Sequence, residues 1–140
     1  MNIHRRGYLM GVGAPEDLAE AVVRGVDIFD CVLPTRIARH GTVFTTDGRI
    51  NMRNAVHEHD QNPIDAEVGG YANEFSRGYI RHLVKSNELL GHYLLSIHNI
   101  NFLIQHMRAM RQAIIDGRLN DYVDRFLARY LNAPKPDTKS

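Results

Sequence analysis

The chain has 140 residues, of which 44% are hydrophobic and 24% charged, a composition typical of one soluble globular domain that excludes a collagen, a low-complexity tail and a disulfide scaffold. Its 17 Lys and Arg against 16 Asp and Glu give a formal net charge of +1. Any contact with nucleic acid would therefore need a local cluster of basic residues, because the overall charge indicates no partner.

Residues 7–13 form a short apolar run closed by alternating glycines, which predicts a buried strand ending in a tight loop. Residues 15–24 predict a helix, because Pro15 suits a first helical turn and acidic residues follow it. Gly25 stands where a helix C-cap belongs.

The β-branched and aromatic run at residues 26–33, stopped by Pro34, predicts a second buried strand that carries Asp27 and Asp30. Together the predicted strand, helix and strand form a βαβ unit. A polar loop is expected over residues 35–41.

Residues 42–46 and 49–53 are strand-like runs on either side of Asp47-Gly48, a strong signal for a β-hairpin. The following residues, 54–74, combine Asn, His, Asp, Pro and paired Gly with little periodicity. They predict a long irregular connection.

The remainder predicts helices over residues 76–85, 88 to about 115 and 119–130, with Gly117 separating the last two. In the long helix, the Tyr, Phe and Met positions are interpreted as core. The polar segment 132–140 contains two prolines and is expected to be a disordered tail.

In barrel and open-sheet enzymes, reactive groups lie at the carboxyl ends of buried parallel strands. Asp30 is a carboxylate at such a position in the predicted strand. In the alternative interpretation, Asp27 or Asp30 caps a loop or pairs with Arg36 or Arg39. These arginines and Thr35 would suit a phosphate or a base edge, or would form a merely solvated basic loop.

The eight histidines give no metal site at recognisable spacing. His57 and His59 would share a face if they lay on a strand, but no third ligand follows, and a solvated loop is the alternative. His98 is a single helical histidine, and such residues are more often hydrogen-bonded core residues than ligands. The single cysteine, Cys31, cannot form an internal disulfide, which favours a reducing, cytoplasmic compartment. No membrane span or signal peptide is predicted.

A specific pattern of motifs extends along nearly the whole chain. It comprises Tyr-Leu-Met-Gly-Val-Gly at 8–13, Pro-Glu-Asp at 15–17, Gly-Val-Asp-Ile-Phe-Asp-Cys-Val-Leu-Pro-Thr-Arg at 25–36, and shorter stretches at 48–54, 63–67, 76–77, 97–99 and 126–130. This pattern resembles the tRNA-guanine transglycosylases, also called queuine tRNA-ribosyltransferases, and their bacterial branch most.

The resemblance implies a (β/α)₈ TIM barrel with a zinc-binding insertion, and an enzyme that exchanges the wobble guanine of certain tRNAs for a 7-deazaguanine in queuosine biosynthesis. In this family an aspartate of the Phe-Asp-Cys-Val motif attacks the anomeric carbon of the ribose, as in a retaining glycosidase. The matching residue is Asp30.

The resemblance also assigns binding residues. Met10 and Gly11 would border the base pocket. The tRNA-contacting loop would comprise Gly11, Val12, Gly13, Ala14, Pro15, Glu16 and Asp17, and the loop that recognises the wobble region would comprise Thr35, Arg36, Ile37, Ala38 and Arg39.

One departure from the family concerns zinc. The family motif of three cysteines, C-x-C-x-x-C, falls on residues 68–73, where no cysteine is present, and one residue fewer precedes Ser76. Only His98 remains at a zinc-ligand position. Since structural zinc requires four ligands, we expect neither zinc nor another cofactor.

The other departure is length, because a complete barrel takes roughly 250 residues. The chain matches only the last strands and the terminal helices of the family, and lacks the segment with the acid–base aspartate. We expect the terminal βα units and hairpin over 1–53, a zinc-less subdomain with C-terminal helices over 54–131, and the tail over 132–140.

Two interpretations follow. In the first, the chain is the C-terminal portion of a transglycosylase and needs the N-terminal portion from another chain, with Asp30 as nucleophile. In the second, it is a non-catalytic relative that binds tRNA through Arg36 and Arg39, or dimerises through its terminal helices with itself or a complete enzyme. The presence of Asp30 favours the first, and the missing cysteines favour the second.

Overall fold

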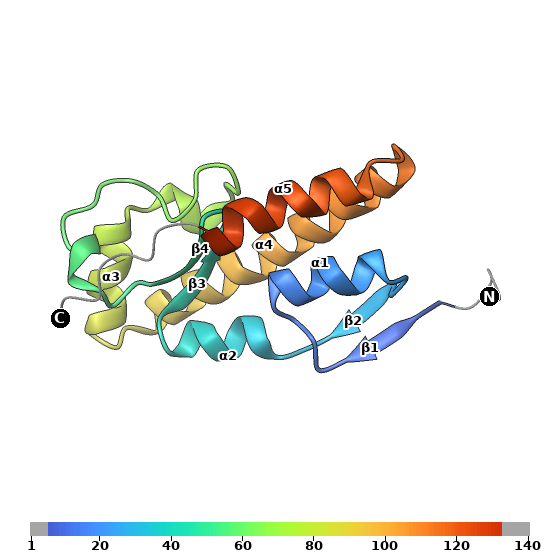
Figure 1. Ribbon diagram of the computed structural model, residues 1–140. Coiled ribbons are helices and arrows are strands. Elements are labelled where there is room, and N and C mark those ends of the chain that lie inside the picture. The colour runs from blue at the N-terminus through green and yellow to red at the C-terminus, as the bar shows by residue number, and fades with distance from the viewer. Residues whose placement is uncertain (1–5, 133–140) are drawn as a thin grey trace.

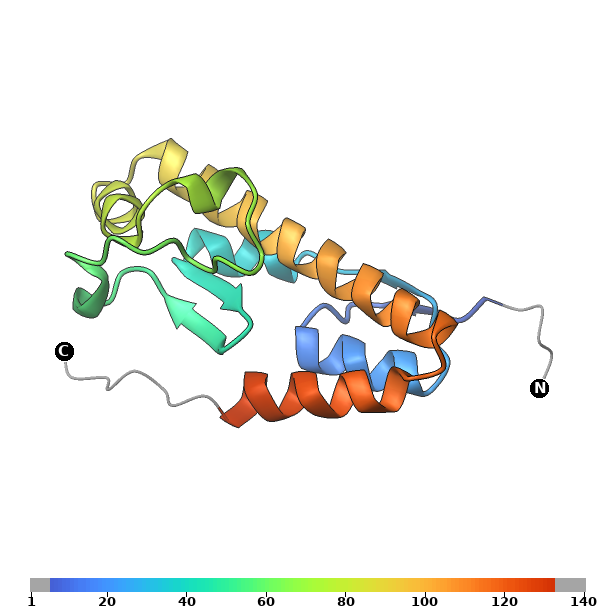
Figure 2. The same ribbon diagram turned by 90° about the horizontal axis from the view of Figure 1, so that it is seen from above.

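The computed structural model describes residues 6–132, and the long helix α4 (Leu89–Ile115) is its centre. In this part of the chain α4 contacts every other α-helix: α1 (Pro15–Val23), α2 (Leu33–Arg39), α3 (Arg77–Lys85) and α5 (Leu119–Asn132). Helix α5 runs back along α4, and α1 lies against both (Figures 1 and 2). No helix within residues 6–132 is long and apolar enough to cross a membrane.

The predicted βαβ unit is confirmed: β1 (Tyr8–Met10) and β2 (Ile28–Asp30) pair in parallel and α1 connects them. The two strands are shorter than predicted, and the prediction that they are buried is wrong. Tyr8 is 57% and Met10 72% exposed. The apolar runs predicted burial, but no further strand pairs with this sheet within the described residues. In Figure 1 it lies on the side of α1 away from α5.

The predicted loop over residues 35–41 is wrong, because most of it belongs to α2. Pro34 lies in the first turn of this helix, where a proline fits since its missing N–H would have no partner there. Ala38 is fully buried, and Leu33 and Ile37 pack against the apolar cluster around Phe44. The strand itself ends at Asp30, before the proline, and Pro34 belongs to the start of the helix.

The predicted hairpin is confirmed as β3 (Thr42–Thr45) and β4 (Gly48–Asn51), but its turn is shifted by one residue. Gly48 pairs with Thr45, which leaves Thr46 and Asp47 as the turn residues, and Gly48 has a φ of +99°. The buried Asp65 carboxylate accepts hydrogen bonds from the N–H and hydroxyl of Thr46, at 2.8 and 2.9 Å. These bonds fix the turn against the next segment of the chain.

The other predicted helices are confirmed. Ser76 caps α3 by accepting a hydrogen bond from the N–H of Tyr79 at 3.1 Å. The connection over 54–74 is irregular apart from two short 3₁₀ turns, Ala55–His57 and Tyr71–Glu74. Helix α5 includes Asn132, which was predicted to begin the tail. The rest of the predicted tail, 133–140, lies outside the described residues.

Two large apolar clusters lie at the two ends of α4. The N-terminal half of α4 packs with α2, α3 and the hairpin, and the C-terminal half packs with α1 and α5. The buried face of α4 consists of Gly91, Leu94, Leu95, His98, Asn99, Phe102, His106, Met110 and Ala113. Tyr93, predicted to be in the core, is 57% exposed. The polar members of the buried face contact backbone groups that are distant in the sequence.

His106 connects three helices. One ring nitrogen, Nε2, lies 3.1 Å from the carbonyl oxygen of Pro15 in α1, and Nδ1 lies 3.1 Å from the hydroxyl of Tyr122 in α5. These partners assign a neutral ring that donates from Nε2 and accepts at Nδ1. Burial lowers the pKa of His106 to about 4.

We therefore expect stability to fall in acid. A histidine whose pKa is lower in the folded state binds fewer protons there than in the unfolded state, so its stabilising effect is present above about pH 6.5 and is lost towards pH 4. For His106 the loss is roughly 2 to 3 kcal/mol. Urea unfolding at pH 7 and pH 4.5 measures it. The variant His106→Gln should show a smaller difference between the two pH values, and an equal difference would contradict the assignment.

Candidate functional site at the carboxyl end of the parallel strands

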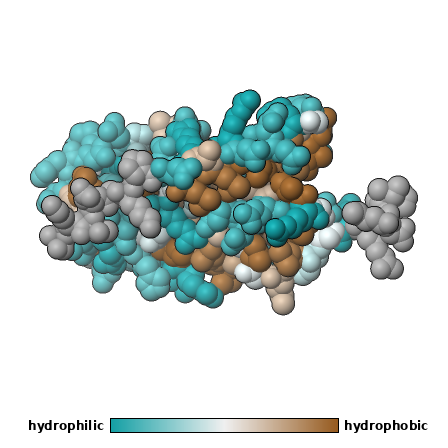
Figure 3. Space-filling model, in the orientation of Figure 1, coloured by the Kyte–Doolittle hydropathy of each residue, from teal (hydrophilic) through white to brown (hydrophobic). Residues whose placement is uncertain are grey.

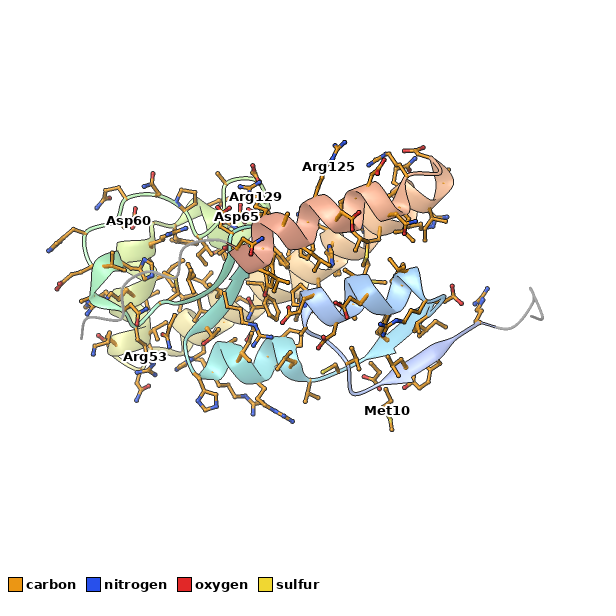
Figure 4. The ribbon with its side chains drawn as sticks, viewed as in Figure 1. Met10, Arg53, Asp60, Asp65, Arg125 and Arg129 are labelled. Atoms are coloured by element: carbon orange, nitrogen blue, oxygen red, sulfur yellow. The ribbon has the colours of Figure 1, made fainter. Side chains whose placement is uncertain are left out.

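The structure brings Met10, Gly11 and Asp30 together where β1 and β2 end. Met10 is the register partner of Asp30, and the N–H of Gly11 donates a hydrogen bond of 2.7 Å to the carbonyl oxygen of Asp30. Gly11 has a φ of +82°, a conformation that glycine adopts readily, so the chain turns away from the strand there. Figure 4 shows the Met10 side chain pointing away from the helices.

The Asp30 carboxylate is exposed and accepts a hydrogen bond from the Tyr8 hydroxyl, with 3.3 Å between Oη and Oδ2. Loss of surrounding water and the charge of Asp30 raise the pKa of Tyr8, so this hydroxyl keeps its proton at neutral pH. Tyr8 precedes Met10 by two residues, and the two side chains lie on the same face of β1 because side chains alternate along a strand. Tyr8 was not predicted from the sequence as a site residue.

The alternative interpretation of the two aspartates is wrong in part. Within residues 6–132, neither Asp27 nor Asp30 forms an ion pair with Arg36 or Arg39. Asp27 does secure a loop, since its carboxylate accepts a hydrogen bond of 2.9 Å from the N–H of Gly7. In contrast, Asp30 accepts a hydrogen bond from Tyr8 on one carboxylate oxygen. Within residues 6–132 its carboxylate forms no ion pair.

The segment 11–17 forms the loop after β1 and the first turn of α1. The side chains of Ala14 and Pro15 are buried, whereas Gly11 and Asp17 are exposed. A ligand on this loop would therefore meet backbone groups and the Asp17 side chain, with the buried residues holding the loop in place.

Three other residues of this segment contact neighbouring elements of the fold. Val12 packs against the apolar cluster of α1 and α5. Gly13 lies so close to Cys31 that a Cβ on this glycine would be 2.8 Å from the cysteine Sγ. Glu16 is turned towards the hairpin, where its carboxylate lies 3.7 Å from the Arg49 guanidinium. Val12 and Glu16 therefore direct their side chains onto neighbouring elements, and Gly13 leaves room for Cys31.

The segment 35–39 lies on α2, which follows directly after β2. Arg36 and Arg39 are exposed and three residues apart, so they share one helix face. Thr35 donates its hydroxyl hydrogen bond to the Val32 carbonyl at 3.1 Å, which fixes the start of the helix. The predicted basic surface is therefore formed by one face of a helix rather than by a loop.

An apolar hollow of about 370 Å³ lies between this βαβ unit and α4. Val12, Phe29, Cys31, Leu103 and Met107 contribute to its lining. Because Phe29 and Cys31 flank Asp30 in the chain, they point to the face of the sheet opposite to that residue. Hydrophobic residues also gather over the α1, α4 and α5 half of the surface in Figure 3.

A larger cavity, of about 1130 Å³, lies between the hairpin turn, the 54–74 connection and the end of α5. Its charges are largely matched internally: the Arg129 guanidinium binds Asp47 at 2.7 Å and Glu67 at 2.8 Å. Arg129 and Asp65, both labelled in Figure 4, contribute to its lining. Among the predicted site residues only Glu16 lines it, so it is separate from the Asp30 site.

The histidine pair does not share a strand face. His57 lies in a 3₁₀ turn and is only 3% exposed, whereas His59 is exposed, so the prediction of a solvated loop fails for His57. Within residues 6–132, no three His, Cys, Asp or Glu side chains gather closely enough to hold a metal ion. His98 is buried, as a hydrogen-bonded core residue.

Comparisons with known proteins confirm the family resemblance of the chain. A family model described as "Queuine tRNA-ribosyltransferase" matches residues 3–132. The chain is 56% identical over 126 residues to a queuine tRNA-ribosyltransferase of Halothermothrix orenii, covering 89% of this chain and 34% of the relative. It is 52% identical over 134 residues to one of Bacillus subtilis, covering 95% and 35%. The chain thus spans about a third of the length of these relatives.

Proposed function

Since this chain belongs to the queuine tRNA-ribosyltransferase family, we propose that it supplies the nucleophile of a base exchange at the wobble guanine of tRNA. One observation carries the proposal. The exposed Asp30 carboxylate stands at the end of a parallel strand, bound by the Tyr8 hydroxyl, with Met10 and Gly11 beside it.

The proposed reaction is a double displacement. A carboxylate oxygen of Asp30 attacks C1′ of the ribose while the bond from C1′ to guanine breaks, and the guanine leaves with a proton supplied by an acid. The incoming 7-deazaguanine loses a proton, attacks C1′ and releases the carboxylate. Tyr8 binds Oδ2, which leaves Oδ1 for the attack.

Binding of tRNA would use the exposed cations of α2. Arg36 and Arg39 lie on α2, the helix that follows the strand of Asp30, and would contact phosphates near the reacting nucleotide. Gly11 and Asp17 would contact the RNA from the other loop. Met10 would border the base pocket.

The remaining part of the site would come from outside the described residues. Parallel sheets are normally covered on both faces, but this sheet has two strands and exposes Tyr8, Met10 and Ile28. We propose that β1 and β2 belong to a (β/α)₈ barrel completed by the other two thirds of a family member, which would also supply the acid. Such a barrel takes roughly 250 residues, more than the 140 of this chain.

A second candidate is a non-catalytic subunit that binds tRNA and associates through its helices. Tyr93, Ile100 and Ile104 form an exposed apolar stripe on α4 at spacings of seven and four residues. Such a stripe favours association with a second copy or with a complete enzyme.

A complementation assay distinguishes the two. The purified chain is incubated with labelled guanine and a tRNA that carries guanine at the wobble position, alone and with a family member truncated to its other two thirds. We expect label to enter the tRNA only in the mixture. Binding of tRNA without exchange in the mixture would contradict the catalytic proposal and favour the second candidate.

A further inference from the structure

Residues 68–73 occupy the place where the family resemblance puts the three zinc cysteines, and their side chains do not fit a zinc ion. Val68, Gly70 and Asn73 stand at the three cysteine positions and offer no thiolate. The fourth position, His98, has both ring nitrogens engaged with protein atoms: Nδ1 lies 3.0 Å from Asn73 Nδ2 and Nε2 lies 2.7 Å from the carbonyl oxygen of Phe44.

Polar side chains of α4 meet each of these three positions instead. His98 contacts Asn73, Asn101 lies against Gly70, and Gln105 donates a hydrogen bond of 2.7 Å to the carbonyl oxygen of Val68. The three α4 residues are spaced by three and four, so they lie on one helix face. Gln105 also donates to the Asn101 amide oxygen at 3.3 Å. We call His98, Asn101 and Gln105 the α4 polar ladder.

Asn73 is the central contact of this arrangement. Its amide oxygen accepts a hydrogen bond of 2.8 Å from the N–H of Asp65, and its amide nitrogen donates to the carbonyl oxygen of Gly69 at 2.6 Å as well as to His98. His98 in turn donates from Nε2 to Phe44 in β3. A continuous series of hydrogen bonds therefore joins the 65–73 segment to α4 and the hairpin.

The backbone at Gly70 is also adapted to a residue without a side chain. Gly70 has a φ of +82°, which disfavours any residue with a Cβ, and a Cβ built there would lie 2.7 Å from Asn101 Nδ2. A cysteine at this position would need both a different backbone conformation and movement of Asn101.

From these contacts we propose that Asn73 and the α4 polar ladder replace the metal, so that this chain folds and holds residues 65–73 against α4 without zinc. This proposal does not depend on the proposed function. It commits the site to hydrogen bonds from amide and imidazole groups and to one tautomer of His98, with Nδ1 free of a proton and Nε2 protonated.

The first test measures zinc on the full chain. We expect the purified protein to contain far less than one zinc per chain, and its melting temperature to stay within about 1 °C when a strong chelator is added. One zinc per chain, with a chelator-dependent fall in melting temperature, would overturn the proposal.

The second test removes the central contact. Asn73→Ala deletes the partners of His98 Nδ1 and of the Asp65 N–H, and should lower the melting temperature by roughly 4 to 10 °C. The control Gln112→Ala, which removes an amide side chain from an exposed position on α4, should change it by less than about 2 °C. Equal changes in both variants would overturn the proposal.

If Asn73→Ala fails to fold, Gln105→Met supplies the same comparison, because it removes the hydrogen bonds to the Val68 carbonyl oxygen and the Asn101 amide oxygen and keeps the length of the side chain. A nitrogen NMR spectrum of the histidine rings gives an independent readout. His98 in the unmodified chain should show the tautomer protonated at Nε2, and the opposite tautomer would contradict the proposed bond from Asn73.

Discussion

Replacement of Asp30 by alanine should lower base exchange in the complemented assay by roughly 10³-fold or more, because a double displacement has no covalent intermediate without its nucleophile. Asp30 is the last residue of β2, and its carboxylate is exposed and bound by Tyr8. Removal of the carboxylate therefore leaves the packing of the βαβ unit intact. Initial rates of incorporation of labelled guanine into tRNA measure the effect.

Asp27→Ala is the matched control, since it removes a second exposed carboxylate from the same region, one that only binds the N–H of Gly7. We expect its rate to remain within a few-fold of the original. Tyr8→Phe removes a hydrogen bond to Asp30 and should lower the rate less than Asp30→Ala does. Exchange that survives in Asp30→Ala would show that another group forms the covalent bond.

The variant Asn99→Ala should lower the free energy of unfolding by roughly 3 to 5 kcal/mol. Asn99 is fully buried. Its amide oxygen accepts from the N–H of Phe44 at 3.0 Å, and its amide nitrogen donates to the carbonyl oxygens of Pro34 and Thr42 at 3.0 and 3.1 Å. Alanine would leave these three backbone groups without their partner in the protein interior.

Urea unfolding monitored by circular dichroism measures this change. Asn120→Ala is the control, because it removes the same side chain from an exposed position in α5 and should change the free energy by less than about 0.5 kcal/mol. A loss in Asn99→Ala no larger than that of the control would mean that the three hydrogen bonds do not stabilise the junction of α2, β3 and α4.

Local patterns were sufficient for the elements whose signals agree. Helix α1 has a proline start and a glycine stop, α3 has its Ser76 cap, and the hairpin has a turn sequence between two strand-like runs. Helix α2 was missed because Pro34 is compatible with the end of a strand and with the start of a helix. The inward packing of Ala38 resolves this ambiguity, and only the tertiary structure shows it.

The buried face of α4 could not be predicted from periodicity, because this helix is apolar on several sides. Its buried polar residues are determined by partners far away in the sequence: Asn99 binds Phe44, 55 residues earlier, and His106 lies beside the carbonyl of Pro15, 91 residues earlier. No local pattern contains such pairs. The zinc position shows the same limit, since the missing cysteines were visible but the amides that meet residues 68–73 were not.

At the candidate site, the sequence placed Asp30 at the end of a strand, and the resemblance assigned Met10 and Gly11 to the border of the base pocket. Tyr8 was missed although it stands two residues before Met10, a spacing that puts both on one strand face. To identify it, one needs the register of β1 against β2, which brings its hydroxyl within reach of Asp30. The family motif supplied the predicted site residues, and the pairing of β1 with β2 supplies their arrangement in space.

Because α4 contributes residues to both apolar clusters, the fold restricts insertions and deletions within this helix. An α-helix turns by about 100° per residue, so one residue inserted in the middle of α4 would rotate the half that packs on α1 and α5 against the half that packs on α3. The phase of α4 is therefore fixed by both clusters. The irregular connection over 54–74 has no such phase, and it is here that the chain is one residue shorter than the family motif.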